Sequence, residues 1–314
     1  MPDPPPLVSV IIACLRSAGV IRGALDSLAQ NDAPPTEVIV VSNGATDGTP
    51  DIVACEYPHV RLIRLPRNLG YAGGINEGVK VARGEILVPL NDDTISQPTM
   101  LRHLVQPLLD HDDIGIVGAK ILDADERTIQ HAGAEILANA CTRHFGRGEK
   151  DEGQYNAAHE VDYVSGCVMA IRRRVFEQLG LFDDRYGPAY YEEVELAVRA
   201  RRAGWRVRYE PKAVVVHLES RTARLFSHAF FFFNHRSRWR FILKNFTLRQ
   251  MLSAVVPELR YLRHRTLWSE RLALLRAYLY VLVRLPMILH DRSHRFLPLA
   301  PLDSPPPQET APHA

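Results

Sequence analysis

The chain has 314 residues, of which 46% are hydrophobic and 24% charged, and its formal net charge is +2. This composition is typical of a soluble protein with one large or two ordinary domains, and it excludes collagen-like chains and wholesale disorder. Four cysteines without C-x-x-C spacing suit neither a zinc site nor a disulfide framework. Because no basic stretch with a long apolar segment opens the chain, we expect no secretory signal and a cytoplasmic location.

The charges are distributed unevenly along the chain. Residues 1–220 carry 23 Lys and Arg against 31 Asp and Glu, whereas residues 221–295 carry 15 against 3. We therefore expect an α/β domain at 7–220 and a basic, aromatic helical region at 221–295, between disordered tails at 1–6 and 296–314. Basic regions of this kind attract the phosphates of nucleic acid or of anionic lipid.

Short runs rich in Val, Ile and Leu alternate with helix-like intervals near the start of the chain. These runs are residues 7–13, 37–42, 60–65 and 85–90. The alternation indicates a mostly parallel sheet with helices on both faces, a doubly wound α/β fold. Ligands of such sheets bind at the carboxyl ends of the strands, so the residues that follow each run are candidate site residues.

The later elements are less regular. The pattern predicts a strand and hairpin over 115–136, a polar mobile loop or lid over 140–160, a helix over 190–203 ended by Gly204, a strand pair over 207–217 broken at Pro211, and helical segments to about 290. The stretch 272–289 is apolar, but Arg276, Arg284 and Pro286 interrupt it. We expect this stretch to lie on a membrane surface and not to span the bilayer.

Two adjacent carboxylates, Asp92 and Asp93, follow the predicted strand at 85–90. An unpartnered buried carboxylate costs several kcal/mol, so a bound cation is a natural partner, although a solvated turn would also explain the pair. His217 ends the last predicted strand on the same rim. An imidazole there can complete an Mg²⁺ or Mn²⁺ sphere together with a carboxylate and diphosphate oxygens, although a lone histidine is more often structural.

Three glutamates occupy the first turn of the helix predicted at 190–203. They suit the helix dipole, which is the simplest explanation for their presence. At about 100° per residue, Glu192 and Glu195 share one face, whereas Glu193 projects elsewhere and can address a cleft as a general base.

The glycine-rich run at 67–78 follows a strand and opens a helix, which offers backbone N–H groups to phosphate. It does not have the G-x-G-x-x-G spacing of a dinucleotide site, and its glycines can also serve close packing of the helix on the sheet.

Taken in order, these segments resemble the GT-A inverting glycosyltransferases of the rhamnosyltransferase-like family, glycosyltransferase family 2, which builds bacterial surface polysaccharides. The resemblance covers residues 7–250. It rests on VSVIIACLR, VIVVSNGATDGT, RNLGYAGGINEG, LNDDT, GCVMAIRRRVFEQLGLFDD, YYEEVELAVRARRAGW and VVVH.

The resemblance implies a role for each matching residue. Asp93 matches the last carboxylate of the family's D-x-D motif, which holds a divalent metal, and His217 matches the family's strand-end metal histidine. Asn91 replaces the first Asp of that motif and would hydrogen-bond ribose or sugar. Glu192 and Glu193 match the family's Glu-Asp pair, whose second member is the catalytic base.

Further positions match the part of the family's site that binds the nucleotide sugar. They are Ala13, Ser42, Asn43, Arg67, Asn68 and Asp92. Ser42 stands where the family usually has an aspartate that accepts a hydrogen bond from the base. Asn43 can accept one from the N3–H that uracil and thymine share, so UDP and dTDP donors both remain open.

The resemblance implies an inverting transferase that moves a sugar, rhamnose-like or other, from a nucleotide-diphosphate donor to a hydroxyl of a glycan or lipid-linked acceptor. A non-catalytic nucleotide-sugar-binding protein and a sugar nucleotidyltransferase are the alternatives.

Four consecutive phenylalanines, 230–233, cover every face of a helix, whereas a site that stacks the bases of nucleic acid has spaced aromatic residues. We therefore expect the basic region to bind an anionic membrane surface peripherally and not nucleic acid, while packing of these rings inside the helical region is the other reading.

Overall fold

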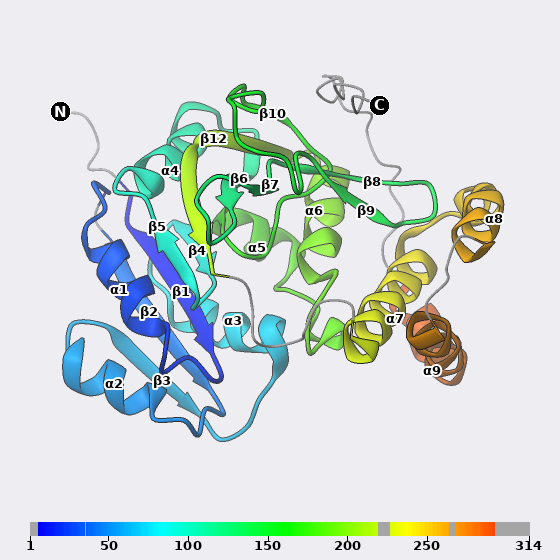
Figure 1. The fold of residues 1–314 in the computed structure, drawn as a ribbon, viewed down its shortest axis with the longest axis horizontal. Coiled ribbons are helices and arrows are strands. Elements are labelled where there is room, and N and C mark those ends of the chain that lie inside the picture. Colours follow the sequence, from blue (N-terminus) through cyan, green and yellow to red (C-terminus); the bar gives the residue numbers. More distant parts are fainter. Residues whose placement is uncertain (1–5, 35, 219–226, 264–267, 293–314) are drawn as a thin grey trace.

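The computed structural model describes residues 6–34, 36–218, 227–263 and 268–292. An α/β domain built on a ten-stranded sheet is followed by a helical unit made of α7, α8 and α9 (Figure 1). This architecture confirms the predicted fold class. Apart from Pro6, the predicted disordered tails lie outside the described residues.

The elements alternate between strand and helix through the first half of the chain. The strands are β1 (Val8–Cys14), β2 (Thr36–Asn43), β3 (Arg61–Leu65), β4 (Ile86–Leu90), β5 (Thr94–Ser96), β6 (Ile114–Leu122), β7 (Ile129–His131), β8 (Ala134–Ile136), β9 (Thr142–His144), β10 (His159–Glu160), β11 (Met169–Arg172) and β12 (Arg206–His217). The α-helices are α1 (Ile21–Ala29), α2 (Thr49–Glu56), α3 (Gly70–Val81), α4 (Met100–Asp110), α5 (Arg173–Leu179), α6 (Glu192–Arg202), α7 (His228–Asn245), α8 (Leu248–Arg263) and α9 (Trp268–Arg292).

The sheet has the order β10-β12-β6-β11-β4-β1-β2-β3. Strands β3, β2, β1 and β4 are parallel, β11 runs antiparallel between β4 and β6, and β12 pairs parallel to β6. Two antiparallel steps restore the original direction, so β12 runs the same way as β4. The carboxyl ends of β1, β2, β4 and β12 therefore meet at one edge of the sheet.

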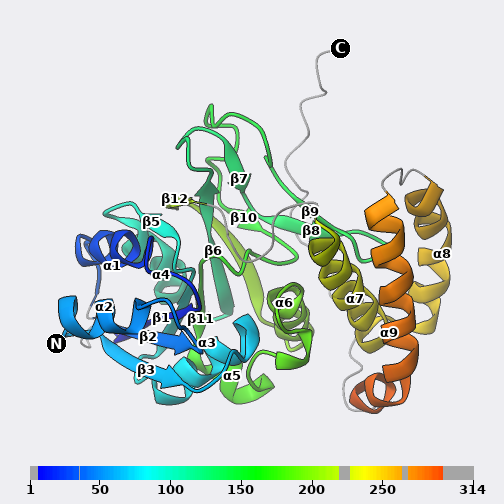
Figure 2. The same cartoon turned by 60° about the horizontal axis from the view of Figure 1, so that its bottom comes forward.

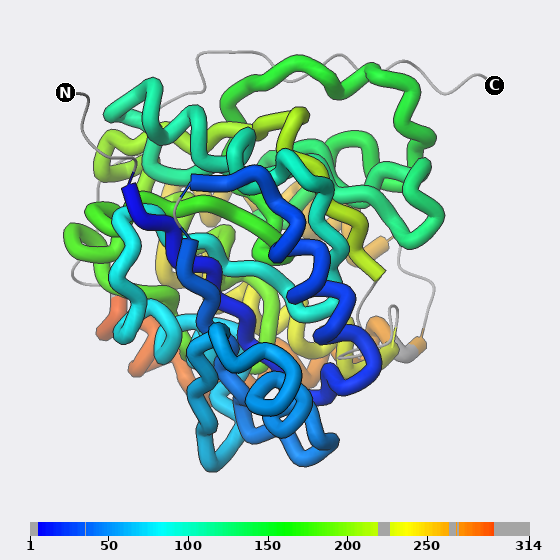
Figure 3. Tube along the Cα trace, turned by 90° about the vertical axis from the view of Figure 1, so that its left-hand side faces the viewer, coloured from blue at the N-terminus to red at the C-terminus, as the bar shows by residue number. Residues whose placement is uncertain are grey.

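Helices cover both faces of the sheet because its central strands are apolar on both sides. On β1, Ile11 faces one core with Ile75 of α3, while Val10 and Ile12 face the other core with Leu25 of α1. Seen from the side of α1 and α2, the C-terminal helices lie behind the sheet (Figure 3).

The predicted end of the helix over 190–203 is confirmed, because α6 ends at Arg202 and Gly204 follows in the left-handed region at φ +93°.

Two predicted elements differ from the structure. The expected strand pair over 207–217 is one continuous strand, β12, whose pairing with β6 shifts register between Glu210 and Val214, around Pro211. An irregularity at this place lets the strand continue past a residue that lacks an N–H donor. The 140–160 segment is largely irregular, as predicted, but Lys120 Nζ of β6 anchors it through contacts with Asp151 and Asn156. Its role as a lid remains a prediction.

The basic helical region contains a buried interior that sequence analysis did not predict. On α7, Arg238, Arg240 and Lys244 are each buried and paired with carboxylates. Phe231 is buried and Phe230, Phe232 and Phe233 are half-buried, which favours the reading in which this run packs inside the helical region. The Phe230 ring, for example, lies 5.4 Å from that of Tyr190. The net charge of this region therefore overstates the charge that it offers to a partner.

Helices α8 and α9 form the outer side of the helical unit, and α7 lies between them and the α/β domain (Figure 2). By length and composition alone, residues Glu270–Asp291 of α9 could cross a membrane. In the structure, 28% of the most apolar 18-residue part of this helix is buried. The interruptions at Arg276, Arg284 and Pro286 do not break the helix. That this stretch lies on a membrane surface remains a prediction.

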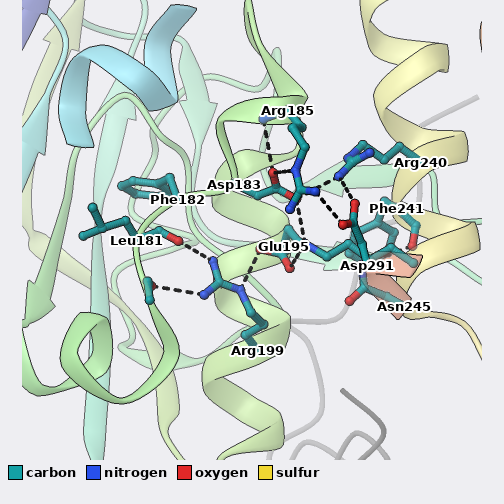
Figure 4. Close-up of polar contacts among 12 residues, drawn as sticks. Leu181, Phe182, Asp183, Arg185, Glu195, Arg199, Arg240, Phe241, Asn245 and Asp291 are labelled. Carbon is teal, nitrogen blue, oxygen red and sulfur yellow. Dashed lines mark hydrogen bonds and ion pairs between the residues drawn. The ribbon is translucent and has the colours of Figure 1, made fainter. Parts of the chain in front are cut away.

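A buried network of charges joins α6, the segment that precedes it, α7 and α9 (Figure 4). Lys244 Nζ lies 2.7 Å from Asp183 Oδ2 and 2.7 Å from Glu195 Oε1. Arg240 bridges Asp183 and Asp291 at 3.1 Å and 2.8 Å. Arg199 pairs with Glu195 at 2.7 Å, one helical turn apart on α6. Lys244 thus connects the helical unit to the helix that carries Glu192 and Glu193.

The electrostatics of Asp183 show why this network holds. Burial alone would raise the pKa of Asp183, but Lys244 and Arg240 lower it well below its ordinary value. The carboxylate is therefore ionised and depends on these two cations for compensation.

We predict that Lys244→Met lowers the free energy of unfolding by roughly 3 kcal/mol, because it removes the cation between two buried carboxylates. Lys80→Met is the matched control, since Lys80 pairs with Glu77 on the surface, and its stability should change little. Urea denaturation of both variants measures the difference. An equal loss in the two variants would show that the buried network does not hold the helical unit in place.

Candidate active site

Asp93 and His217 meet at the carboxyl edge of the sheet. Asp93 lies just beyond β4, and His217 is the last residue of β12, which pairs with β5 so that His217 lies opposite Thr94. Asp93 Oδ1 is a buried oxygen that accepts no hydrogen bond, and it lies 3.0 Å from His217 Nε2. Asn91 Nδ2 lies 3.3 Å from the same nitrogen. The structure therefore brings together three of the predicted residues.

The second nitrogen of His217 has a partner that sequence analysis missed. His217 Nδ1 lies 2.7 Å from the side-chain oxygen of Gln130, on β7. With Nδ1–H donated to this amide, Nε2 is the nitrogen that faces Asp93. Metal-binding histidines are commonly oriented in this way through their other nitrogen. No local pattern identifies Gln130, because its partner is 87 residues away.

These two side chains fit a hard divalent cation such as Mg²⁺ or Mn²⁺. The Asp93 carboxylate oxygen and the neighbouring His217 Nε2 are two suitable ligands, once Nε2 carries no proton. Within the described residues, no three His, Cys, Asp or Glu side chains converge on one metal position. Such a cation would therefore take its remaining ligands from water or from a bound diphosphate, as Mg²⁺ commonly does.

Asp92 points to another part of the site than Asp93 does. Its Oδ2 accepts a hydrogen bond from the Ser17 hydroxyl, in the loop after β1. Burial raises the pKa of Asp92 to about 6, with a further rise from the Asp93 charge and against the effect of the Ser17 hydrogen bond. The two loops at the ends of β1 and β4 are thus joined. The role of Asp92 in binding a nucleotide sugar remains a prediction.

Asn43 organises the loops that follow β2 and β3. Its Oδ1 accepts a hydrogen bond from the Leu69 N–H at 2.8 Å, and its Nδ2 donates to Asn68 Oδ1 at 3.2 Å and to the Gly70 carbonyl at 2.9 Å. Gly44 has a φ of +73°, and a Cβ there would lie 2.5 Å from the Asn68 nitrogen, so only glycine fits. The side chain of Asn43 thus has a structural task besides the predicted contact with the base.

The remaining predicted donor-binding residues lie around this loop arrangement. Ala13 is near the end of β1, where a Cβ on Gly74 of α3 would lie 2.9 Å from the Ala13 Cβ. Ser42 is buried next to Asn43, whereas Arg67 is exposed beside Asn68. Their contacts with a nucleotide remain predictions.

Glu192 and Glu193 open α6 after two residues with an uncommon backbone. Tyr190 and Tyr191 have φ values of 79° and 75°, a region that costs non-glycine residues of order 1–3 kcal/mol. The Tyr191 hydroxyl donates to the Ala140 carbonyl at 2.6 Å, and the contact helps hold this turn. This turn directly precedes the first residue of α6, Glu192.

The two glutamates differ in environment. Glu192 is only 4% exposed and its Oε2 has no hydrogen-bond partner, whereas Glu193 is half-buried. Burial raises the pKa of both carboxyl groups, and the charge of Glu193 raises that of Glu192 further. The two carboxyl groups therefore titrate as a pair above the ordinary glutamate range, and Glu192, the more deeply buried member, holds a shared proton more readily than Glu193 does. Only the ionised carboxylate can act as a base.

Tyr71 of α3 lies between the two glutamates and the segment that packs against Asn91. Its hydroxyl donates to the Gly166 carbonyl, and Glu192 and Glu193 raise its pKa beyond the rise that burial causes. The neighbouring Cys167 carbonyl accepts a hydrogen bond from the Asn91 N–H at 2.8 Å. Tyr71 lies inside a glycine-rich stretch, but a single tyrosine there carries no signal that it contacts residues 95 positions away.

Comparison with known proteins identifies the family. The family model "Glycosyltransferase like family 2" matches residues 4–241. The O-antigen biosynthesis protein RfbC of Myxococcus xanthus is 32% identical over 230 residues, which are 70% of this chain and 18% of RfbC. The N-acetylglucosaminyl-diphospho-decaprenol L-rhamnosyltransferase of Mycobacterium tuberculosis is 29% identical over 216 residues, 62% of this chain and 70% of that protein. The chain thus spans less than a fifth of the first relative.

Solved structures agree on the fold. A mannosyltransferase of Pyrobaculum calidifontis, in complex with GDP-Man and Mn²⁺, superposes with a TM-score of 0.55 at 18% identity over 92% of this chain and 84% of that one. GalNAc-T7 with UDP, GalNAc and Mn²⁺ gives a TM-score of 0.59 at 14% identity over 76% of this chain and 48% of that one. With the family model matching most of the chain, this protein belongs to the glycosyltransferase-like family 2.

Proposed function

We propose that this protein is an inverting glycosyltransferase of surface-polysaccharide synthesis. In this proposal it moves a sugar from a UDP- or dTDP-linked donor to a hydroxyl of a glycan or lipid-linked acceptor. The observation that carries the proposal is the Asp93–His217 pair at the carboxyl edge of the sheet, together with Tyr71, whose pKa is raised by burial and further by both Glu193 and Cys167. A relative that acts in O-antigen synthesis and another that transfers L-rhamnose to a diphospho-decaprenol acceptor support the substrate classes.

Glu193 is the proposed base for the acceptor. An acceptor hydroxyl has a pKa far above 7, so a carboxylate must take its proton as the oxygen attacks the anomeric carbon. One direct displacement inverts the configuration at that carbon. Glu192, which holds a proton beside Glu193, keeps the charge of the pair at one and leaves Glu193 as the acceptor of the proton.

Asp93 and His217 are the proposed ligands of a divalent cation. Asn91, whose Nδ2 lies 3.3 Å from His217 Nε2, would donate a hydrogen bond to the ribose or sugar of the nucleotide sugar. When bound, such a cation neutralises the charge of the diphosphate leaving group. Asn43, Gly44 and Asn68 shape the loop edge against which the nucleoside would lie.

We predict that UDP- or dTDP-sugars stabilise the protein only when Mg²⁺ or Mn²⁺ is present. At one hundred times its dissociation constant, a ligand adds about 2.7 kcal/mol to the unfolding free energy, which a thermal-shift panel detects. Asp93→Ala and His217→Ala should lose this stabilisation, while Asp112→Ala, which removes a fully exposed carboxylate just before β6, should keep it.

Activity assays with the same nucleotide sugars separate the alternative functions. Full transfer activity in excess EDTA would contradict the metal assignment. Pyrophosphate release from nucleoside triphosphates, without sugar transfer, would indicate a nucleotidyltransferase. Donor binding without any turnover would indicate a non-catalytic nucleotide-sugar-binding protein.

We predict that Glu193→Gln lowers kcat by roughly 10²–10⁴ with donor binding almost unchanged, because the amide keeps the shape but accepts no proton. In the wild type, kcat/KM should rise with pH as Glu193 ionises, and the raised pKa places this rise above the ordinary glutamate range. Glu192→Gln should be mild, since Glu192 is already protonated. The opposite pattern in the two variants would assign the base to Glu192.

The outer helices carry the surface that we propose for membrane binding. The side chains that α8 exposes recur at helical spacing: Leu248, Leu252, Val255, Val256 and Leu259. Leu252 is 65% exposed and Leu259 61% exposed, and Arg249, Arg260 and Arg263 are exposed on the same helix. An apolar stripe flanked by arginines fits the interface of an anionic bilayer. We call this surface the α8 stripe.

We predict that the protein floats with phosphatidylglycerol vesicles at low salt and less at high salt, since each basic residue contributes about 1 kcal/mol near such a surface. Leu252→Gln/Leu259→Gln should reduce flotation, whereas Leu109→Gln, at an exposed leucine of α4, should not. If the variant instead dissociates a dimer and floats like the wild type, the stripe binds a second copy of the chain and not lipid.

A further inference from the structure

Three arginines gather around two aromatic rings at the contact of α7 and α9. The Arg236 guanidinium lies 5.9 Å from the centre of the Phe232 ring and 5.1 Å from that of Tyr280. Arg276 lies 5.4 Å from the Phe232 ring and Arg284 lies 4.0 Å from the Tyr280 ring. The shared rings hold the cations close to one another. Arg236, Arg276 and Arg284 are called the arginine cluster below.

The arginine cluster differs from the other cations of α7 in its partners. Arg238, Arg240 and Lys244 each pair with a carboxylate within 3.1 Å. Within the described part of the chain, no member of the cluster forms such an ion pair. Arg236, which is 7% exposed, instead donates to the carbonyls of Tyr186 and Gly187.

The charges within the cluster repel one another. Burial lowers the pKa of Arg236, and the charges of Arg284 and Arg240 lower it further, partly offset by Tyr280 and Glu192. Arg276 and Arg284 are exposed, so a ligand can reach them. Guanidinium groups with free donors and no carboxylate partner are suited to phosphate, which several of them can bind at once.

The arginine cluster lies between the loop that leads to α6 and an exposed apolar part of α9. On one side, Arg236 contacts the loop at Tyr186 and Gly187 that leads to α6, and its charge influences Glu192. On the other side, α9 exposes Leu279, Leu282 and Val283 next to Tyr280 and Arg284. A ligand with an apolar tail, a phosphate and a hydroxyl could therefore place its phosphate on the cluster while its tail lies along α9.

We propose that the arginine cluster binds the phosphate groups of a lipid-linked acceptor, so that the acceptor's sugar hydroxyl is presented toward Glu193. The assignment rests on the proposed transferase function and specifies its acceptor as one that carries phosphate between lipid and sugar. Arg276 and Arg284 supply the accessible contacts, and Arg236 forms the base of the site.

The test measures binding of geranyl diphosphate, a soluble isoprenyl diphosphate, by calorimetry in EDTA, so that the proposed metal site does not contribute. Arg276→Gln and Arg284→Gln should each weaken binding roughly tenfold, as expected for loss of one charged hydrogen-bonding partner. Both residues are exposed, so the variants should fold, which circular dichroism checks. Arg271→Gln, an exposed arginine of α9 outside the cluster, is the charge-matched control and should bind as the wild type does.

Several results would overturn the proposal. Unchanged affinity in both cluster variants would do so, as would an equal loss in Arg271→Gln, which would indicate attraction by net charge alone. Loss of binding in Asp93→Asn would place the probe in the donor site. If the cluster variants keep their affinity for geranyl diphosphate but lose flotation with phosphatidylglycerol vesicles, the arginines contact lipid headgroups and not the acceptor. Because none of these measurements requires sugar transfer, a failure of the transferase function would appear separately, as missing turnover.

Discussion

Lys244 lies between two buried carboxylates, and the arrangement of the proposed active site depends on that contact. One carboxylate, Asp183, belongs to the segment before α6, and the other, Glu195, lies on α6 two residues after Glu193. A buried carboxylate without a counter-charge is strongly unfavourable, so the position of α6 and the position of α7 are fixed together. The helical unit is therefore part of the framework that aims Glu193, and the family match extends into α7, to residue 241.

The predictable part of the structure follows from local patterns. Runs of Val and Ile located the central strands, and their alternation with helices predicted a parallel sheet whose carboxyl edge collects polar residues. That rule placed Asp93 and His217 together although 124 positions separate them, and the structure has them 3.0 Å apart. The stop of α6 at Gly204 was predictable because the chain there adopts a conformation that favours glycine.

The rest depends on partners that are distant in sequence. Ser17 contacts Asp92 and Gln130 contacts His217 across 75 and 87 positions, and a polar residue carries no mark of the partner it will meet. The charge that residues 221–295 offer to a partner was overestimated for the same reason. The number of arginines and lysines does not tell which of them are paired with carboxylates in the interior. Only the folded arrangement separates Arg240 and Lys244, which are paired with buried carboxylates, from Arg276 and Arg284, which remain accessible.

The orientation of the α8 stripe has a consequence for how an acceptor is found. Helices α8 and α9 lie on one side of the molecule, and α7 separates them from the α/β domain (Figure 2). A protein held by that side would search for a lipid-linked acceptor in two dimensions, while its donor arrives from the surrounding water. Confinement to a plane raises the effective concentration of the acceptor, much as a tether does. The acceptor site itself can then be weak and release its product quickly without loss of occupancy.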